Sequence, residues 1–212
     1  MINYSHILGA LAIGCLLGYG VGRYRTRSFQ NDGEALVSRA IQANFAPPDY
    51  HLLNHITLKL KAGTTQIDHI LVSRFGVFVI ETKAYKGWIF ANPAHAQWTQ
   101  VLFSGKFKFQ NPIAQNRLHV RAVEELLDFL PATAIHSLVV FAGRAEFKTK
   151  RPHGVLTVSE LVNHLRGYTD EVLSTNRVQF CVGRLETARL EVSGQTDLEH
   201  VTYLRRRHGL RN

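Results

Sequence analysis

Two carboxylates, Asp68 and Glu81, stand directly against apolar runs in neighbouring segments of the chain. Residues 65–73 and 77–82 both have the composition of β-strands, and the turn between them is short enough for an antiparallel hairpin. Asp68 comes early in the first strand and Glu81 comes late in the second. We therefore expect the hairpin to bring the two carboxylates together at one edge of a sheet.

A divalent cation would stabilise such a pair, because two unpaired carboxylates at a partly buried edge repel each other and lose hydration. Mg²⁺ is commonly bound by one or two carboxylates together with water and phosphate oxygens. Lys83 follows Glu81 by two residues, so the alternation of side chains along a strand places its ammonium on the same face. There it could hold a water nucleophile or stabilise charge on a phosphate. This combination indicates hydrolysis of phosphodiesters by a metal-activated water.

The same spacing also has a purely structural interpretation. Asp68 could end a turn, and Glu81 could form an ion pair with Lys83 or with an arginine at the rim of the sheet. Spacing alone does not choose between this interpretation and a metal site.

The composition favours an anionic partner. The chain has 212 residues, a formal charge of +9 and a pI of about 9.8, which suits nucleic acid, phosphate or an acidic membrane surface. The alternative interpretation of this composition is a basic soluble protein without such a partner. With 45% hydrophobic residues the chain can bury a substantial core. Two distant cysteines, Cys15 and Cys181, exclude a disulfide framework and a zinc ribbon and suit a reducing compartment.

The first residues are expected to form a membrane anchor. Residues 7–22 are apolar and uncharged, and with residues 4–6 they approach the roughly 20 residues that span a bilayer. Arginines at 23, 25 and 27 follow, which places the rest of the chain on the cytoplasmic side. Positive charge does not precede the apolar run, so a cleaved signal peptide is not expected. The alternative is a buried or interfacial helix.

This interpretation divides the chain into a single-pass transmembrane anchor over residues 1–24 and a linker over residues 25–32. Gly14 and Gly18 form a small-residue motif that could let two anchors pack as a weak homodimer. Residues 33–145 would form the core of the domain. Residues 146–212 would be a C-terminal extension that completes or flanks the core and ends in a basic tail.

The order of predicted elements indicates an α/β sandwich around a mixed sheet. Besides the two strands above, we expect a helix over residues 33–44, capped by Asn31 or Asp32, and a long helix that opens after Asn111-Pro112 and ends before Pro131. The other expected elements are strands over 50–61, 135–141 and 155–158, a hairpin tip at 103–107, a helix from Ser159 to about Arg166, and a helix near 170–174.

Several blocks in this order resemble the nuclease-related domain (NERD) family, over roughly residues 32–141. The blocks are Gly33-Glu34, Gln66-Ile67-Asp68-His69, Val79-Ile80-Glu81-Thr82-Lys83, Gly87, Trp98 and Asn111-Pro112-Ile113-Ala114-Gln115. That family is placed in the PD-(D/E)xK superfamily. The resemblance therefore implies a restriction-endonuclease-like fold, in which helices flank a mixed sheet. Ile67 stands where the superfamily has a proline.

The resemblance also implies roles for individual residues. Asp68 and Glu81 would be the metal ligands for Mg²⁺ or Mn²⁺, and Lys83 would be the catalytic lysine. Glu34 and Gln115 would reach the site from two helices. The implied function is a membrane-tethered nuclease that acts on nucleic acid, DNA in particular. The alternative is a non-catalytic nucleic-acid-binding or protein-interaction module on the same fold.

Four further residues are assigned to packing rather than to chemistry. His69 should point to the opposite face of its strand from Asp68. His119 lies one helical turn after Gln115 and is expected to be a satisfied core or surface histidine. Trp88 and Trp98 could stack on bases, but packing in the core or in a lid is the preferred interpretation.

Overall fold

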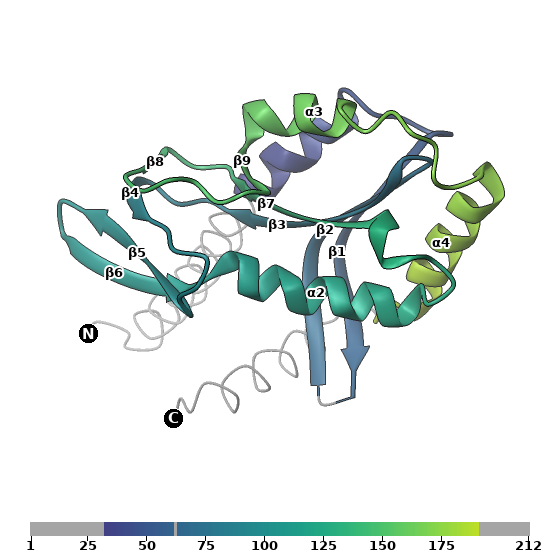
Figure 1. Ribbon diagram of the computed structural model, residues 1–212, viewed down its shortest axis with the longest axis horizontal. Helices are drawn as coiled ribbons and strands as arrows, with labels where there is room; N and C mark the ends of the chain where they lie inside the picture. Colours follow the sequence, from purple (N-terminus) through teal and green to yellow (C-terminus); the bar gives the residue numbers. More distant parts are fainter. Residues whose placement is uncertain (1–31, 62, 191–212) are drawn as a thin grey trace, which may run out of the picture.

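The computed structural model describes residues 32–61 and 63–190, and these form two mixed β-sheets with helices on both faces of the larger sheet (Figure 1). The larger sheet has the strand order β1-β2-β3-β7-β9 and the smaller one β6-β5-β4-β8. The strands are β1 (Tyr50–Leu60), β2 (Gly63–Ser73), β3 (Gly76–Lys83), β4 (Gly87–Phe90), β5 (Gln97–Leu102), β6 (Gly105–Gln110), β7 (Ile135–Phe141), β8 (Ala145–Phe147) and β9 (Val155–Thr157). The helices are residues 32–42, α2 (Pro112–Leu126), α3 (Val158–Arg166) and α4 (Thr175–Ala188), with the short η1 (Ala132–Ala134).

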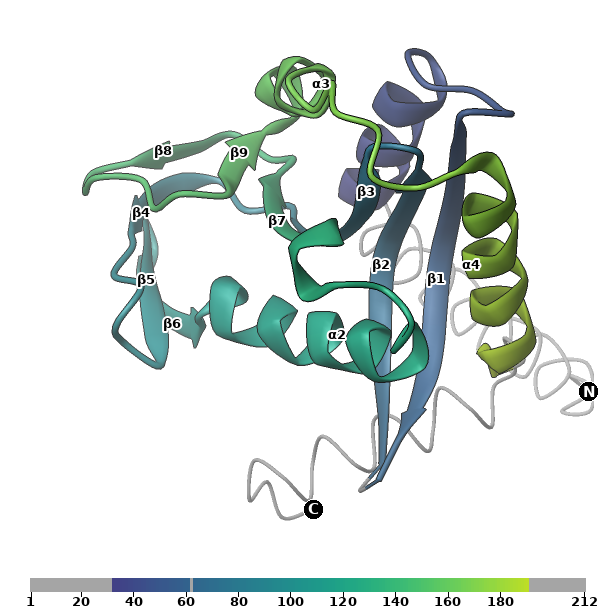
Figure 2. The ribbon, with the colours of Figure 1, turned by 45° about the vertical axis from the view of Figure 1, so that its right-hand side comes forward.

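Two apolar layers hold the larger sheet between its helices. On one face, α2 and α4 cover the inward side chains of β1, β2 and β3, and on the other face the helix of residues 32–42 and α3 cover β2, β3 and β7 (Figures 1 and 2). Because β3 is covered on both faces, nearly all of its side chains are buried. The α/β prediction is confirmed in this form.

In β1 and β2, the regular alternation of side chains between the two faces of the sheet is interrupted at the same point. Leu53 and Ile56 of β1 belong to the same apolar layer although three positions separate them, and so do Ile67 and Ile70 of β2. The pairing of β1 with β2 includes Asn54 and His69 but skips His55 and Asp68, and His55 adopts a left-handed backbone with φ of 52°. A left-handed non-glycine residue costs about 1–3 kcal/mol and is commonly found at functional sites. In both strands, therefore, the side chains that point to a given face of the sheet change from odd to even positions, or the reverse, beside Asp68.

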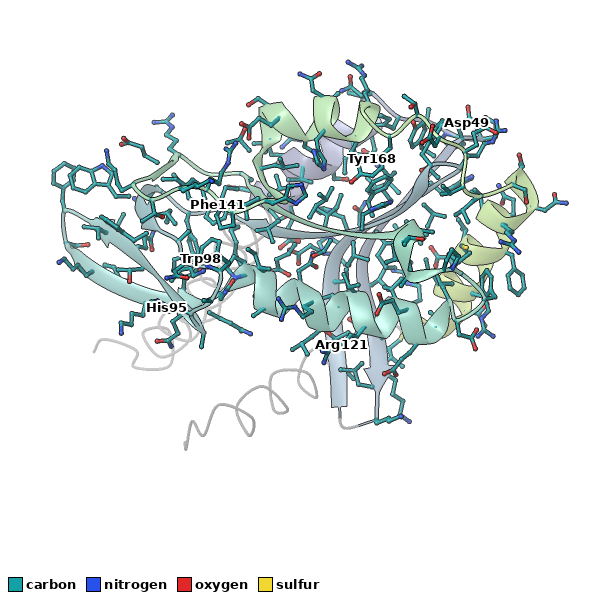
Figure 3. All side chains as sticks on the ribbon, viewed as in Figure 1. Asp49, His95, Trp98, Arg121, Phe141 and Tyr168 are labelled. Carbon is teal, nitrogen blue, oxygen red and sulfur yellow. The ribbon has the colours of Figure 1, made fainter. Side chains whose placement is uncertain are left out.

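The smaller sheet begins where β3 and β7 end. β4 pairs with β8 in parallel, as β3 pairs with β7, and a third apolar cluster fills the junction. In that cluster the indole of Trp98, 1% exposed, stacks on Phe141 with the ring planes 11° apart (Figure 3). Core packing is thus confirmed for Trp98. For Trp88 it is wrong, since that side chain is 49% exposed on β4.

The C-terminal part differs from the sequence prediction in two places. Thr157, rather than Ser159, caps α3, because its hydroxyl and backbone N–H both contact the carboxylate of Glu160. The helix predicted near residues 170–174 is absent. Leu173 is buried there and its N–H donates to Arg74 O, so this stretch packs as a loop against the β2–β3 turn. The helix begins only at α4, after Ser174.

None of the helices in the described part of the chain is long and apolar enough to cross a bilayer. The predicted anchor of residues 1–24, its small-residue motif, nearly all of the predicted linker and the basic tail lie outside the described residues.

Candidate active site

Asp68 lies at the point where β2 and β3 separate. The last paired residues of these strands are His69 and Ile80. Beyond them, the backbone N–H of Thr82 donates to Asp68 Oδ2 at 2.7 Å, so the carboxylate takes the place of a backbone acceptor. The hydrogen bond holds Asp68 next to the end of β3 that carries Glu81. The hairpin thus brings the two carboxylates together, as the sequence predicts.

Glu81 is the centre of a buried polar network, and both of its oxygens have partners. The side chain is 2% exposed. Lys83 Nζ donates to Oε1 at 2.6 Å and His119 Nε2 donates to Oε2 at 3.0 Å. Lys83 Nζ also donates to Gln115 Oε1 at 3.1 Å. The hydroxyl of Thr65 lies 2.6 Å from His119 Nδ1, so both ring nitrogens of His119 have a partner.

Helix α2 delivers Gln115 and His119 because a buried asparagine between them fixes the helix to the sheet. Asn116 is fully buried, and its Nδ2 donates at 2.9 Å to the carbonyl oxygens of Val79 in β3 and Leu138 in β7. Gln115 and His119 are one helical turn apart, so they lie on the same side of the helix and face the end of β3.

Glu34 approaches from the opposite layer. The helix of residues 32–42 lies very close to the sheet at Gly33, since a Cβ there would lie 2.8 Å from the Cβ of Ala84. Glu34 Oε2 is 3.2 Å from His55 Nδ1, the histidine with the left-handed backbone. The negative charge of Glu34 raises the pKa of Asp68. Both helices that the sequence predicts to contribute to the site therefore do reach it.

Burial and charge separate the pKa values of the two central carboxyls. Burial, and then the charges of Glu81 and Glu34, raise the pKa of Asp68 well above its usual range. Burial would also raise the pKa of Glu81, but hydrogen bonds and charge from His119 and Lys83 outweigh it and lower the pKa. Burial opposes the charge of Lys83, yet Glu81 raises its pKa. The site thus contains one carboxyl that readily takes a proton and one that stays ionised.

The donor chemistry of the site fits a hard divalent cation. Asp68 and Glu81 offer carboxylate oxygens, and a cation would relieve the mutual repulsion that raises the pKa of Asp68. Among the described residues, no group of three or more His, Cys, Asp and Glu side chains is arranged to hold a metal ion. A cation would therefore be held by two carboxylates and water, as is common for Mg²⁺, and Glu81 would exchange one of its hydrogen bonds for it.

His69 and His119 are both buried, but only His119 belongs to the polar network of Glu81. His69 is fully buried away from the network, where its Nδ1 contacts Asn54 Oδ1 at 2.7 Å, and burial lowers its pKa to about 4. Its burial and its hydrogen bond to Asn54 agree with its assignment to packing rather than to chemistry. His119 is satisfied, as predicted, but its partner is Glu81, so it belongs to the site that the sequence interpretation left it out of. The signal that could have identified it is its spacing of one helical turn from Gln115.

The fold and the site define an α/β domain with acidic residues and a lysine at the end of a central strand. A family model described as "Nuclease-related domain" matches residues 30–142, and the chain belongs to this family and to its nuclease-like superfamily. An uncharacterised protein of Bacillus anthracis is 36% identical over 178 residues, which cover 81% of this chain and 82% of the relative. The comparison with solved structures yields no match.

Proposed function

We propose that the protein is a metal-dependent nuclease on a restriction-endonuclease-like fold and that it hydrolyses phosphodiester bonds of nucleic acid, DNA in particular. The observation that carries the proposal is the buried carboxylate of Glu81, held by Lys83 at 2.6 Å and adjoined by Asp68 at the end of β3. Membership of the nuclease-related family supports the same conclusion.

Each residue has a distinct role in this proposal. Asp68 and Glu81 would hold Mg²⁺ or Mn²⁺, which when bound supplies a water of lowered pKa and stabilises negative charge on the phosphate. Lys83 places an ammonium where the phosphate would lie, and Gln115 orients that ammonium through its amide oxygen. His119 fixes the orientation of the Glu81 carboxylate.

Glu34 adds a third negative charge to the same region. Burial, and then the charges of Glu81 and Glu34, raise the pKa of Asp68. Burial also raises the pKa of Glu34, where the charge of His55 opposes the shift and that of Glu81 adds to it. A cation beside the three carboxylates would therefore find a strongly negative potential, and the carboxylates would lose their mutual repulsion when it bound.

The location of the protein is a further part of the proposal. The apolar run of residues 7–22, followed by arginines, supports a single-pass anchor that keeps the domain on the cytoplasmic side. Extraction of cell membranes with alkaline carbonate tests this point. Recovery of the intact chain in the soluble fraction would contradict the anchor and would leave the nuclease proposal unaffected.

A second candidate is a nucleic-acid-binding module without catalysis. One observation favours it: both oxygens of Glu81 are already satisfied by Lys83 and His119. Because all of its hydrogen bonds are satisfied within the protein, this network could serve only to hold α2 against β2 and β3.

The test is a cleavage assay with the full-length chain on supercoiled, linear and single-stranded DNA in Mg²⁺, Mn²⁺ or EDTA. The proposal expects cleavage only with metal and a loss of about 10³-fold in Asp68→Asn, which retains the acceptor for the Thr82 N–H. The matched control is Asp49→Asn, an exposed carboxylate beside Arg74, which should leave the rate unchanged.

Metal-independent cleavage, or cleavage that survives in Asp68→Asn, would overturn the catalytic proposal. If the wild-type chain does not cleave but binds DNA with an affinity that falls steeply with salt, the binding module is correct instead.

A further inference from the structure

The smaller sheet carries a concentrated positive charge. Residues 84–110 and 143–152, which include all four of its strands, contain seven Lys and Arg residues and a single acidic residue, Glu146. Glu146 forms an ion pair with Lys148, so its charge is locally compensated. The rest of the chain has 18 Lys and Arg against 15 acidic residues, as obtained from the totals of 25 and 16. Most of the excess charge of the protein thus belongs to this sheet and the segments that flank its strands, although Arg151 is paired with Glu160 of α3.

A hollow of about 600 Å³ lies on the same sheet. Its lining is mostly apolar and includes two basic residues, Lys86 and Arg144, together with Trp88, Val101, Leu102 and Phe103. Trp88 is 49% exposed, and the ammonium of Lys148 lies 4.8 Å from the centre of its ring. Phe103 projects fully exposed from the turn between β5 and β6. An aromatic face with basic neighbours is the arrangement on which unpaired bases stack.

The hollow is connected to the candidate active site through the backbone. Lys83 ends β3, and β4 begins at Gly87, so Lys86 in the lining of the hollow is three positions from the lysine of the site. Gly87 N–H donates to Arg144 O at 3.2 Å, which sets the second basic residue of the lining beside the first. Gly87 has a φ of 78°, and a Cβ there would lie 2.5 Å from Val101 O, so a side chain at this position would be both strained and in collision.

We infer that this hollow is a subsite for an unpaired base of single-stranded nucleic acid. The base stacks on Trp88, and Lys86 and Arg144 neutralise the phosphates on either side of it. The inference rests on the proposed function for the nature of the polymer. It adds that the substrate is single-stranded at this point, because a base inside a duplex must leave its stack before it can reach an aromatic side chain.

The shape of the surface separates this ligand from a membrane. Aromatic and basic residues also occur on segments that lie in the interface of a bilayer, where apolar side chains project into it. Trp88 instead lines a concave hollow, and one of its faces has an ammonium above it. These features favour a planar ring that enters the hollow.

The experiment measures binding of a fluorescein-labelled oligothymidylate to the full-length chain by anisotropy, in EDTA so that no cleavage contributes. Single strand should bind more tightly than a blunt duplex of the same length. Trp88→Ala should weaken binding about tenfold with the salt dependence unchanged. Lys86→Gln and Arg144→Gln should each lower the slope of log affinity against log salt by roughly 0.7. Phe180→Ala, an equally exposed aromatic on α4, is the matched control and should have no effect.

A second readout uses the two tryptophans of the chain. Trp98 is buried, so the oligonucleotide should quench the emission of Trp88 only, and Trp88→Phe should abolish the quenching. The proposal is overturned if Trp88→Ala binds as tightly as the wild type, or if the duplex is preferred. It is also overturned if Trp88→Ala loses affinity for phosphatidylserine–phosphatidylcholine vesicles while the oligonucleotide still binds.

The two proposals can fail separately. If Trp88 proves irrelevant to binding but metal-dependent cleavage is observed, the subsite is wrong and the nuclease stands. If Trp88-dependent binding is observed without cleavage, the subsite stands and catalysis is wrong. Asp68→Asn should bind the oligonucleotide at least as well as the wild type, because it removes only a negative charge.

Discussion

The two sheets of this protein differ in the exposure of their charged residues. The larger sheet buries Glu81 against α2 and pairs each of its oxygens with a side chain. The smaller sheet exposes its lysines and arginines around a half-exposed tryptophan. Burial shifts the pKa values of the acidic residues, whereas exposure keeps the basic residues accessible to a polymer.

Under the proposed function, this difference divides the residues of the reaction from those of recognition. A chemical step needs groups whose protonation is set by their surroundings, and such groups must be shielded from water. Binding of a polyanion needs positive charge that a phosphate can approach. Both requirements meet where β3 leads into β4, since Lys83 lies at the buried end of this connection and Lys86 at the exposed end.

The largest expected effect separates these two lysines. Lys83→Met removes the ammonium from the carboxylate network, and we expect the turnover rate for cleavage to fall by about 10³-fold. Lys86→Met should raise KM several-fold and leave kcat unchanged, because in the proposed subsite it removes one phosphate contact and no part of the network. Steady-state cleavage kinetics of both variants measure the contrast. Equal losses of kcat in the two variants would contradict the division between the sheets.

The next effect concerns the stability of the larger sheet and its dependence on pH. Glu81→Gln leaves Lys83 buried without its main partner, and we expect a loss of about 3 kcal/mol in the free energy of unfolding at pH 7. Because the folded state lowers the pKa of Glu81, its stabilising effect is present above the unfolded pKa and is lost as the pH falls through the folded value. The cost of Glu81→Gln should therefore shrink in acid.

Asp68→Asn is the matched variant for this measurement, and the expected sign is opposite. The folded state raises the pKa of Asp68, so the favourable contribution is complete below the unfolded pKa and is lost as the pH rises through the folded value. At pH 7 the asparagine removes a carboxyl whose ionised form the folded state disfavours, so it should raise the stability, and the gain should vanish below the unfolded pKa. Urea unfolding in EDTA across this pH range measures both variants. The same sign for both would refute the assignment.

A smaller effect tests whether His119 orients Glu81. His119→Ala removes the donor to Glu81 Oε2, and we expect cleavage to fall about 10–100-fold, as for other residues that orient a metal-binding carboxylate. The amount of Mn²⁺ needed for half-maximal cleavage should rise in parallel. His95→Ala, an exposed histidine ahead of β5, serves as the control. A loss of stability without any change in metal requirement would show that His119 is only structural.

The sequence was sufficient for those parts of the site that depend on local pattern. The β2–β3 hairpin and the same-face position of Lys83 follow from turn length and strand alternation, and the structure has both. The spacing of His119 from Gln115 was a signal, but its contact with Glu81 was not predicted, because Glu81 lies 38 positions away in sequence and the packing of α2 brings them together. Trp88 was misassigned because the burial of a tryptophan depends on which face of the smaller sheet is covered, and that is set by tertiary contacts.

The exchange of faces beside Asp68 is the feature least visible in the sequence. Alternation of apolar residues in β1 and β2 predicts regular strands, and nothing local indicates that His55 takes a left-handed backbone. The irregularity arises where the helix of residues 32–42 presents Glu34 to His55 at 3.2 Å. It coincides with a contact between segments that are distant in the chain. Local pattern describes the core of the larger sheet better than its active end.

The smallest expected effect tests the exposed side of the comparison. Phe103 is fully exposed in the turn between β5 and β6, so Phe103→Ser should change the free energy of unfolding by less than about 0.5 kcal/mol. Its loss should weaken binding of the oligothymidylate by no more than about fivefold, since the ring borders the hollow and Trp88 supplies the main stacking face. Urea unfolding and anisotropy on the same preparation give both values. A large loss of stability would mean that this aromatic ring packs against the protein, and the smaller sheet would then have a buried side that resembles the larger one.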